Sequence, residues 1–130
     1  AFDKVRNHFG MNRAAQAGAL AALNDTAWLA ETRTRIEAAR SRIARIAADN
    51  GLTALPSAAN FVAIDCGGDA ARAKTVLEGL IRRGVFVRMP FAAPQNRCIR
   101  VSCGTPAQLD AFAAALPEAL REAADGAAAG

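Results

Sequence analysis

The segment CIRVSC at residues 98–103 is the part of the sequence that decides the fold class. Its side chains alternate in character, so Ile99 and Val101 fall on one face of an extended chain and Arg100 falls on the other. This alternation is typical of a β-strand that turns one face toward a core. We therefore predict a strand over residues 97–103.

The residues that follow this strand begin a helix. Thr105 fits the N-cap, Pro106 fits the first helical position, and Gln108 can bond back to the cap. We expect Pro117 to kink or split this helix, because proline lacks the N–H that a helical hydrogen bond needs. The Ala/Gly-rich tail at residues 123–130 is predicted to be disordered.

Upstream of residue 98 the sequence predicts further strands and one more helix. The run NFVAIDC at residues 60–66 is typical of a buried strand, and residues 52–57 and 85–88 predict two shorter strands. Asp69 can cap a helix that extends to about residue 83, where a glycine follows and can end it.

Two more helices are predicted before the first strand. Asn12 can cap a helix at residues 13–23 that consists almost wholly of small residues. Residues 24–26 break this pattern and begin a longer helix that ends before Gly51 and carries an apolar stripe. A sheet of three or four strands would not cover both helices, so we expect part of their surface to contact something else.

The predicted order of elements is helix, helix, strand, strand, helix, strand, strand, helix. This order predicts an α/β domain of the two-layer α+β type, with a small, mostly antiparallel sheet and helices packed on one face. We divide the chain into an interdomain helix region at residues 1–24, a small domain at residues 25–122 and the tail at residues 123–130.

Composition limits the class of protein. A chain of 130 residues with 52% hydrophobic and 22% charged residues fits one globular domain. The net charge of +4 is compatible with an anionic small-molecule partner, although a solvated surface explains it more simply. The three cysteines lack the spacing of a metal site or a disulfide framework. We see no apolar leader or membrane-spanning run, and expect a cytoplasmic location.

Three polar residues in or beside the predicted strands are candidate binding residues: Arg100, Arg88 and Asn60. A guanidinium within a strand is expensive to desolvate unless a carboxylate or phosphate meets it. Arg88 ends a strand just before a loop, and could join Arg100 in a two-pronged anion site. Taken alone, each residue is better explained by an ordinary role, the arginines on a solvated surface and Asn60 as a partner of nearby backbone.

Five segments, in this order and spacing, resemble the C-terminal part of histidinol-phosphate aminotransferases, which are fold-type I pyridoxal-phosphate enzymes. They are FDKVR at 2–6, NRAAQAGALAAL at 12–23, PSAANF at 56–61, RGVFVR at 83–88 and CIRVSCGT at 98–105. The resemblance covers nearly the whole chain outside the tail.

The resemblance implies that the chain is part of a dimeric aminotransferase of histidine biosynthesis. Arg100 would bind the α-carboxylate of an amino-acid substrate, and Arg88 the phosphate of a phosphorylated amino alcohol. Asn60 and Phe61 would lie at the mouth of the small domain. The lysine and other residues that hold pyridoxal phosphate would lie upstream, in a large domain of the same polypeptide. No catalytic, cofactor-binding or metal-binding residue is then expected here, and the chain should be inactive alone.

Two alternatives remain open. A related pyridoxal-phosphate enzyme, such as a threonine-phosphate decarboxylase, shares the arginine pair, and the sequence barely separates the two. A stand-alone module for anions or nucleic acid would use the arginines of the long helix. These lie around the helix without forming one stripe and have no aromatic stacking platform, so we expect neither nucleic acid nor a membrane as partner: Arg33, Arg35, Arg40, Arg42 and Arg45.

Overall fold

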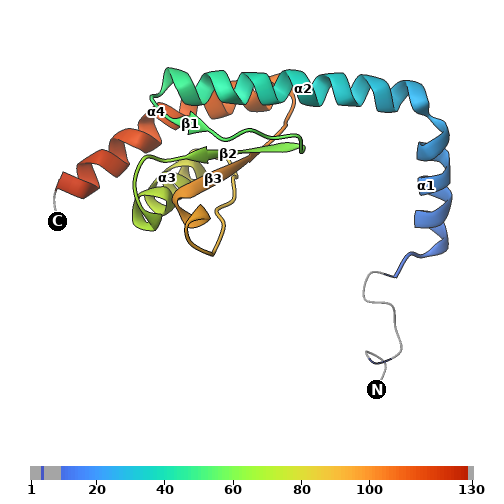
Figure 1. The fold of residues 1–130 in the computed structure, drawn as a ribbon, viewed down its shortest axis with the longest axis horizontal. Coiled ribbons are helices and arrows are strands. Elements are labelled where there is room, and N and C mark those ends of the chain that lie inside the picture. Colours follow the sequence, from blue (N-terminus) through green and yellow to red (C-terminus); the bar gives the residue numbers. More distant parts are fainter. Residues whose placement is uncertain (1–3, 5–9, 129–130) are drawn as a thin grey trace. The chain divides into compact units, whose positions relative to one another are not determined.

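A computed structural model describes residue 4 and residues 10–128 of this chain. The chain divides into two compact units, Ala1–Thr34 and Arg35–Gly130 (Figure 1). The three-stranded sheet lies in the second unit, and it is this unit that carries the candidate binding residues.

The first unit contains α1 (Arg13–Asn24) and the start of α2 (Thr26–Asp49). Asn12 caps α1 as predicted, because its side-chain oxygen accepts the N–H of Ala15 at 2.8 Å. Asp25 accepts the N–H of Trp28 at 3.0 Å in the same way, at the start of α2. None of the residues of α1 is buried, which matches the expectation of apolar surface beyond the needs of the sheet.

The sheet has three antiparallel strands in the order β1 (Thr53–Ala54), β2 (Phe61–Asp65) and β3 (Cys98–Ser102). Side chains on a strand alternate between its two faces. The face that enters the core carries the alternate residues Val62, Ile64, Ile99 and Val101, all buried. The antiparallel sheet and the alternation in β3 confirm the predicted fold class.

Three helices pack on this apolar face. They are α3 (Ala70–Arg82), α4 (Pro106–Ala128) and the second half of α2. Their buried residues form one cluster with those of the strands. The largest members that the helices contribute are aliphatic apart from one phenylalanine: Ile43, Val76, Leu80, Phe112 and Leu116. The opposite face of the sheet is left for other contacts.

Capping residues begin or end the helices of this unit where the sequence predicts. The capping box of α4 forms, with the Thr105 N–H donating to Gln108 Oε1 at 2.8 Å and the Gln108 N–H to Thr105 Oγ1 at 3.4 Å. Gly51 and Gly84 follow α2 and α3 with φ of 70° and 76°, a left-handed conformation that glycine adopts without strain.

The predicted strand at residues 85–88 does not form as a strand. Only Arg88 pairs with β3, as a single antiparallel bridge to Arg100. The segment before it leaves the ladder, while Gln95–Arg97 forms a short 3-10 helix, η2, directly before β3. α3 ends at Arg82, Gly84 follows it, and the chain reaches the sheet edge only at Arg88.

The end of the chain differs from the expectation in the length of its helix. α4 is not split at Pro117, and buried residues lie on both sides of the proline. It also continues to Ala128, so residues 123–128 are helical, and Ala123 is only 4% exposed within the core cluster. In the described part of the chain, no helix combines the length and the apolar character that a membrane span requires.

α3 and α4 pack closely, and three charged side chains lie at their contact. A Cβ on Gly79 would come within 3.1 Å of the Ala119 Cα, so the two helices approach closely at this glycine. Nearby, Glu122 of α4 accepts hydrogen bonds from Arg83 at 2.7 Å and from Arg82 at 2.5 Å. These bonds, first that from Arg83, lower the pKa of Glu122 from 4.5 to about 2.

Phe112→Ala tests the core. Phe112 is 1% exposed and is the largest fully buried side chain. Its truncation should lower the free energy of unfolding by about 3–5 kcal/mol, measured by urea denaturation. Phe91→Ala is the matched control, since that ring is fully exposed and its loss should change stability by less than about 0.5 kcal/mol. Equal losses in the two variants would contradict the described core.

Glu122→Gln tests the charge cluster between α3 and α4. Because the folded-state pKa of Glu122 lies below its ordinary value, its ionised form stabilises the folded state above pH 4.5. The wild type should therefore be more stable than the variant at neutral pH, and this advantage should disappear as pH falls from about 4.5 to about 2. Denaturation midpoints across this range measure the difference, and an advantage that does not change with pH would refute the ion pairs.

Candidate functional site

The candidate site lies on the open face of the sheet, opposite the core. The register places Ala63 opposite Arg100 and Phe61 opposite Ser102, so these four residues share this face. Arg100 is exposed, and among the described residues no carboxylate forms an ion pair with it. Binding of an anion by Arg100 requires a guanidinium that no carboxylate of the protein has already neutralised.

Arg100 is held by a ring. Its guanidinium carbon lies 4.0 Å from the centroid of Phe61, which is the distance of a cation–π contact. Phe61 is diagonal to Arg100 across the two strands, and such diagonal neighbours are within reach of aromatic and long side chains. The sequence analysis named Phe61 but did not foresee this contact, because it depends on the register of β2 against β3.

Arg88 is brought beside Arg100 by the backbone. Its N–H donates to the Arg100 carbonyl oxygen at 3.1 Å, and the Arg100 N–H donates to the Arg88 carbonyl oxygen at 2.6 Å. Two residues that exchange both hydrogen bonds in an antiparallel pair project their side chains to the same side of the sheet. The two predicted anion-binding residues therefore share the open face.

A groove of about 760 Å³ extends from this pair toward α3. Its cationic residues are Lys74, Arg88 and Arg100, and its apolar wall comes from Leu77 of α3 and from Met89, Pro90 and Phe91 of the following segment. None of the described residues that line it is acidic. Lys74 is a cation that the sequence analysis left on the polar side of a helix, and it also pairs loosely with Glu78 at 3.7 Å.

Asp65, the acidic residue on the same face of β2, is already neutralised. Arg97 donates to its two carboxylate oxygens at 3.0 and 2.7 Å, and the Gly67 N–H donates to it at 2.9 Å. The hydrogen bond from Arg97, followed by that from Gly67, lowers the pKa of Asp65 below its ordinary value. Asp65 is thus held at the beginning of β3, where it does not neutralise Arg100.

The third predicted residue, Asn60, is not among those that line the groove. It is exposed at the entrance to β2, where its carbonyl oxygen accepts the Cys103 N–H at 2.9 Å. This placement fits the ordinary role for its backbone, and it leaves the side chain open to solvent beside Phe61.

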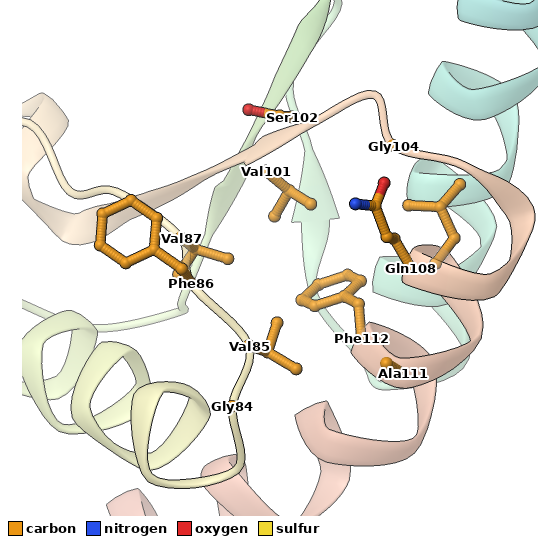
Figure 2. Close-up of a pocket in the computed structure, with 11 residues that line it drawn as sticks. Gly84, Val85, Phe86, Val87, Val101, Ser102, Gly104, Gln108, Ala111 and Phe112 are labelled. Atoms are coloured by element: carbon orange, nitrogen blue, oxygen red, sulfur yellow. The ribbon is translucent and has the colours of Figure 1, made fainter.

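A second pocket of about 330 Å³ lies where the segment before Arg88 leaves β3 (Figure 2). Val85, Val101 and Phe112 point into it, with Gln108 and Gly104 at the start of α4 on its opposite side (Figure 2). It contains no charged lining residue among those described, so it has little to offer an anion.

The cysteines have the properties of core residues. All three are free, and Cys66 and Cys98 are buried. Burial raises the pKa of Cys66 to about 11, and desolvation also raises the pKa values of the other two. Within the described residues no group of His, Cys, Asp or Glu could hold a metal ion. The thiols are therefore poor nucleophiles, and the candidate chemistry rests on the arginines.

Comparison with known proteins identifies the family of this chain. The family model "Aminotransferase class I and II" matches residues 1–116. The chain is 37% identical over 118 residues to histidinol-phosphate aminotransferase 1 of Mesorhizobium japonicum, covering 91% of this chain and 31% of that protein. It is 39% identical over 124 residues to histidinol-phosphate aminotransferase 2 of Rhizobium meliloti, covering 92% and 34%.

A solved structure matches as well. It is the crystal structure of histidinol-phosphate aminotransferase from Sinorhizobium meliloti in complex with pyridoxal-5'-phosphate, at 55% identity and a TM-score of 0.85. The match covers 92% of this chain and 33% of that one. The matched region is thus one part of that longer chain. The chain belongs to the class I and II aminotransferase family, and it spans about a third of the length of the relatives it matches.

The lysines of this chain do not fit the cofactor of that relative. A lysine that forms a Schiff base needs a desolvated pocket that lowers its pKa. The chain has only Lys4 and Lys74. Lys4 is exposed, and the side chain of Lys74 is 67% exposed and faces Glu78. Neither Lys4 nor Lys74 is therefore a suitable attachment point for pyridoxal phosphate.

Proposed function

We propose that this chain is the C-terminal domain of a pyridoxal-phosphate-dependent aminotransferase of the histidinol-phosphate type, and that Arg88 and Arg100 bind the anionic groups of its substrates. The observation that carries this proposal is the backbone pairing of the two arginines on an open face, where no carboxylate of the described residues forms an ion pair with either of them. Family membership and the identity to histidinol-phosphate aminotransferases support the type of enzyme.

The arginine side chains account for the part of the reaction that falls to this domain. A guanidinium presents its N–H donors as a planar fork that matches a carboxylate or phosphate in two parallel hydrogen bonds. Arg100 would receive the α-carboxylate of an amino acid, and Arg88 the phosphate of a phosphorylated amino alcohol. Fixing the anion orients the reacting carbon and removes much of the entropic barrier. Pyridoxal phosphate, when bound, supplies the electron sink.

The remaining parts of the proposal concern the whole protein. We place the cofactor and its lysine in a large domain of the same polypeptide, because the lysines described here do not fit that role. Residues 1–24 would connect the two domains, which accounts for the exposed apolar side chains of α1. We propose a homodimer in the cytoplasm, as the resemblance implies, with Asn60 as a further substrate-binding residue at the entrance to β2.

Nucleic acid is a poor partner for this surface. Two of the five arginines that would form such a module make contacts within the domain. Arg40 donates to the Ala59 carbonyl oxygen at 3.0 Å, and Arg42 pairs with Asp110 and donates to the Pro106 carbonyl oxygen at 3.0 Å. These bonds attach α2 to the segment before β2 and to the start of α4, which supports a structural role for the long helix.

The isolated chain tests the placement of the cofactor. After incubation with pyridoxal phosphate it should show no stable absorbance band of a lysine Schiff base, because its lysines are not desolvated. Absorbance spectra before and after gel filtration measure this, with free pyridoxal phosphate as the control. A band that persists after filtration would show that the cofactor lysine has been placed in the wrong part of the protein.

Arg100→Ala in the full-length protein tests the anion role. Hydrogen bonds to charged groups contribute about 1.5–3 kcal/mol, so kcat/KM for a carboxylate substrate should fall by roughly 10- to 100-fold. The affinity for pyridoxal phosphate, measured by fluorescence titration, should stay within about twofold of the wild type. Arg121→Ala, on the exposed side of α4, is the matched control and should change neither value. Equal losses of substrate and cofactor binding would refute the role.

A further inference from the structure

The Arg100 guanidinium can contact one partner with its flat face and a different partner with its edge. The Arg100 guanidinium carbon lies 4.0 Å from the Phe61 centroid, so the ring covers one flat face of the cation. All five N–H donors of a guanidinium lie in its plane and point outward from its edge. A ring stacked on the face therefore holds the group without taking any of the donors that an anion needs.

The strands give this contact a fixed platform. Phe61 precedes Val62 in β2, and Val62 and Ile64 are buried on the core face, which fixes the backbone of the strand. The Phe61 carbonyl oxygen also accepts the Ser57 hydroxyl at 2.5 Å. The position directly opposite Arg100 is Ala63, whose small side chain leaves room for the arginine to extend diagonally over the ring.

We infer that Phe61 is a positioning residue for the anion site, one that holds the Arg100 guanidinium with its edge turned to the carboxylate or phosphate of the substrate. This inference rests on the proposed function of Arg100 and adds a residue to it. A flexible arginine loses rotamer freedom when it binds an anion, and the ring removes part of that loss before binding. The ring also excludes water from one face of the cation, which strengthens the attraction to an anion.

The experiment compares Phe61 variants in the full-length protein. Phe61→Leu keeps an apolar side chain but removes the π-face, while Phe61→Tyr keeps the face. A cation–π contact at an exposed site contributes about 0.5–1 kcal/mol, so Phe61→Leu should raise KM for the anionic substrate by roughly 2- to 5-fold with kcat nearly unchanged. Phe61→Tyr should restore the wild-type KM. Ile81→Ala is the control, since Ile81 is an exposed apolar residue of α3 that lines neither the groove nor the pocket beside Arg88 and Arg100.

A second measurement uses the 130-residue chain and requires no cofactor. Titration with inorganic phosphate, followed by the NMR signal of the Arg100 side-chain Nε–H, should give weaker binding in Phe61→Leu than in the wild type and Phe61→Tyr. Circular dichroism shows whether each variant is folded, and if the leucine variant is not, Phe61→Trp takes its place and should bind phosphate at least as tightly as wild type.

The outcomes separate the two claims. If Arg100→Ala weakens anion binding while Phe61→Leu does not, the positioning role is wrong and the proposed function stands. If Phe61→Tyr is as weak as Phe61→Leu, the side chain acts through packing alone, and the inference is again wrong. If Arg100→Ala has no effect on either measurement, the proposed function itself is wrong.

Discussion

Two hydrogen bonds between the backbones of Arg88 and Arg100 set the geometry of the candidate site. They hold two guanidinium side chains on one face of the sheet, and like charges directly opposite each other destabilise an antiparallel pair. The fold can maintain this arrangement because the other face of the sheet is packed against three helices. A bound anion would relieve the repulsion, so the same constraint that opposes folding would favour the ligand.

Most of the fold could be predicted from the sequence, because the decisive signals were local. The side chains of Thr105 and Gln108 bond to each other's backbone N–H, and the Asn12 side chain bonds three residues along, so residue type and spacing were sufficient. The alternation in β3 was equally direct, since it depends only on the two-residue period of an extended chain. Arg88 and Arg100 could be named as candidate binding residues because each lies in or beside a predicted strand.

The errors and omissions came from contacts between distant parts of the chain. Whether residues 85–88 pair with β3 along their whole length depends on where the chain that follows α3 meets the edge of the sheet. The last turns of α4 are rich in Ala and Gly, and their order follows from the burial of Ala123 in the shared core. The contact of Phe61 with Arg100 required the strand register, and the position of Lys74 required the packing of α3 beside the groove.

The absence of an acidic lining residue in the described part of the groove has a practical consequence for the choice of buffer. A cationic surface that lacks an internal counter-ion collects one from solution. Phosphate and sulfate also present pairs of oxygen atoms that a guanidinium fork can bind, so in purification buffers they would compete with a carboxylate for Arg100. Weak ligands are best sought in a zwitterionic amine buffer with chloride as the anion, where only general screening acts on the site.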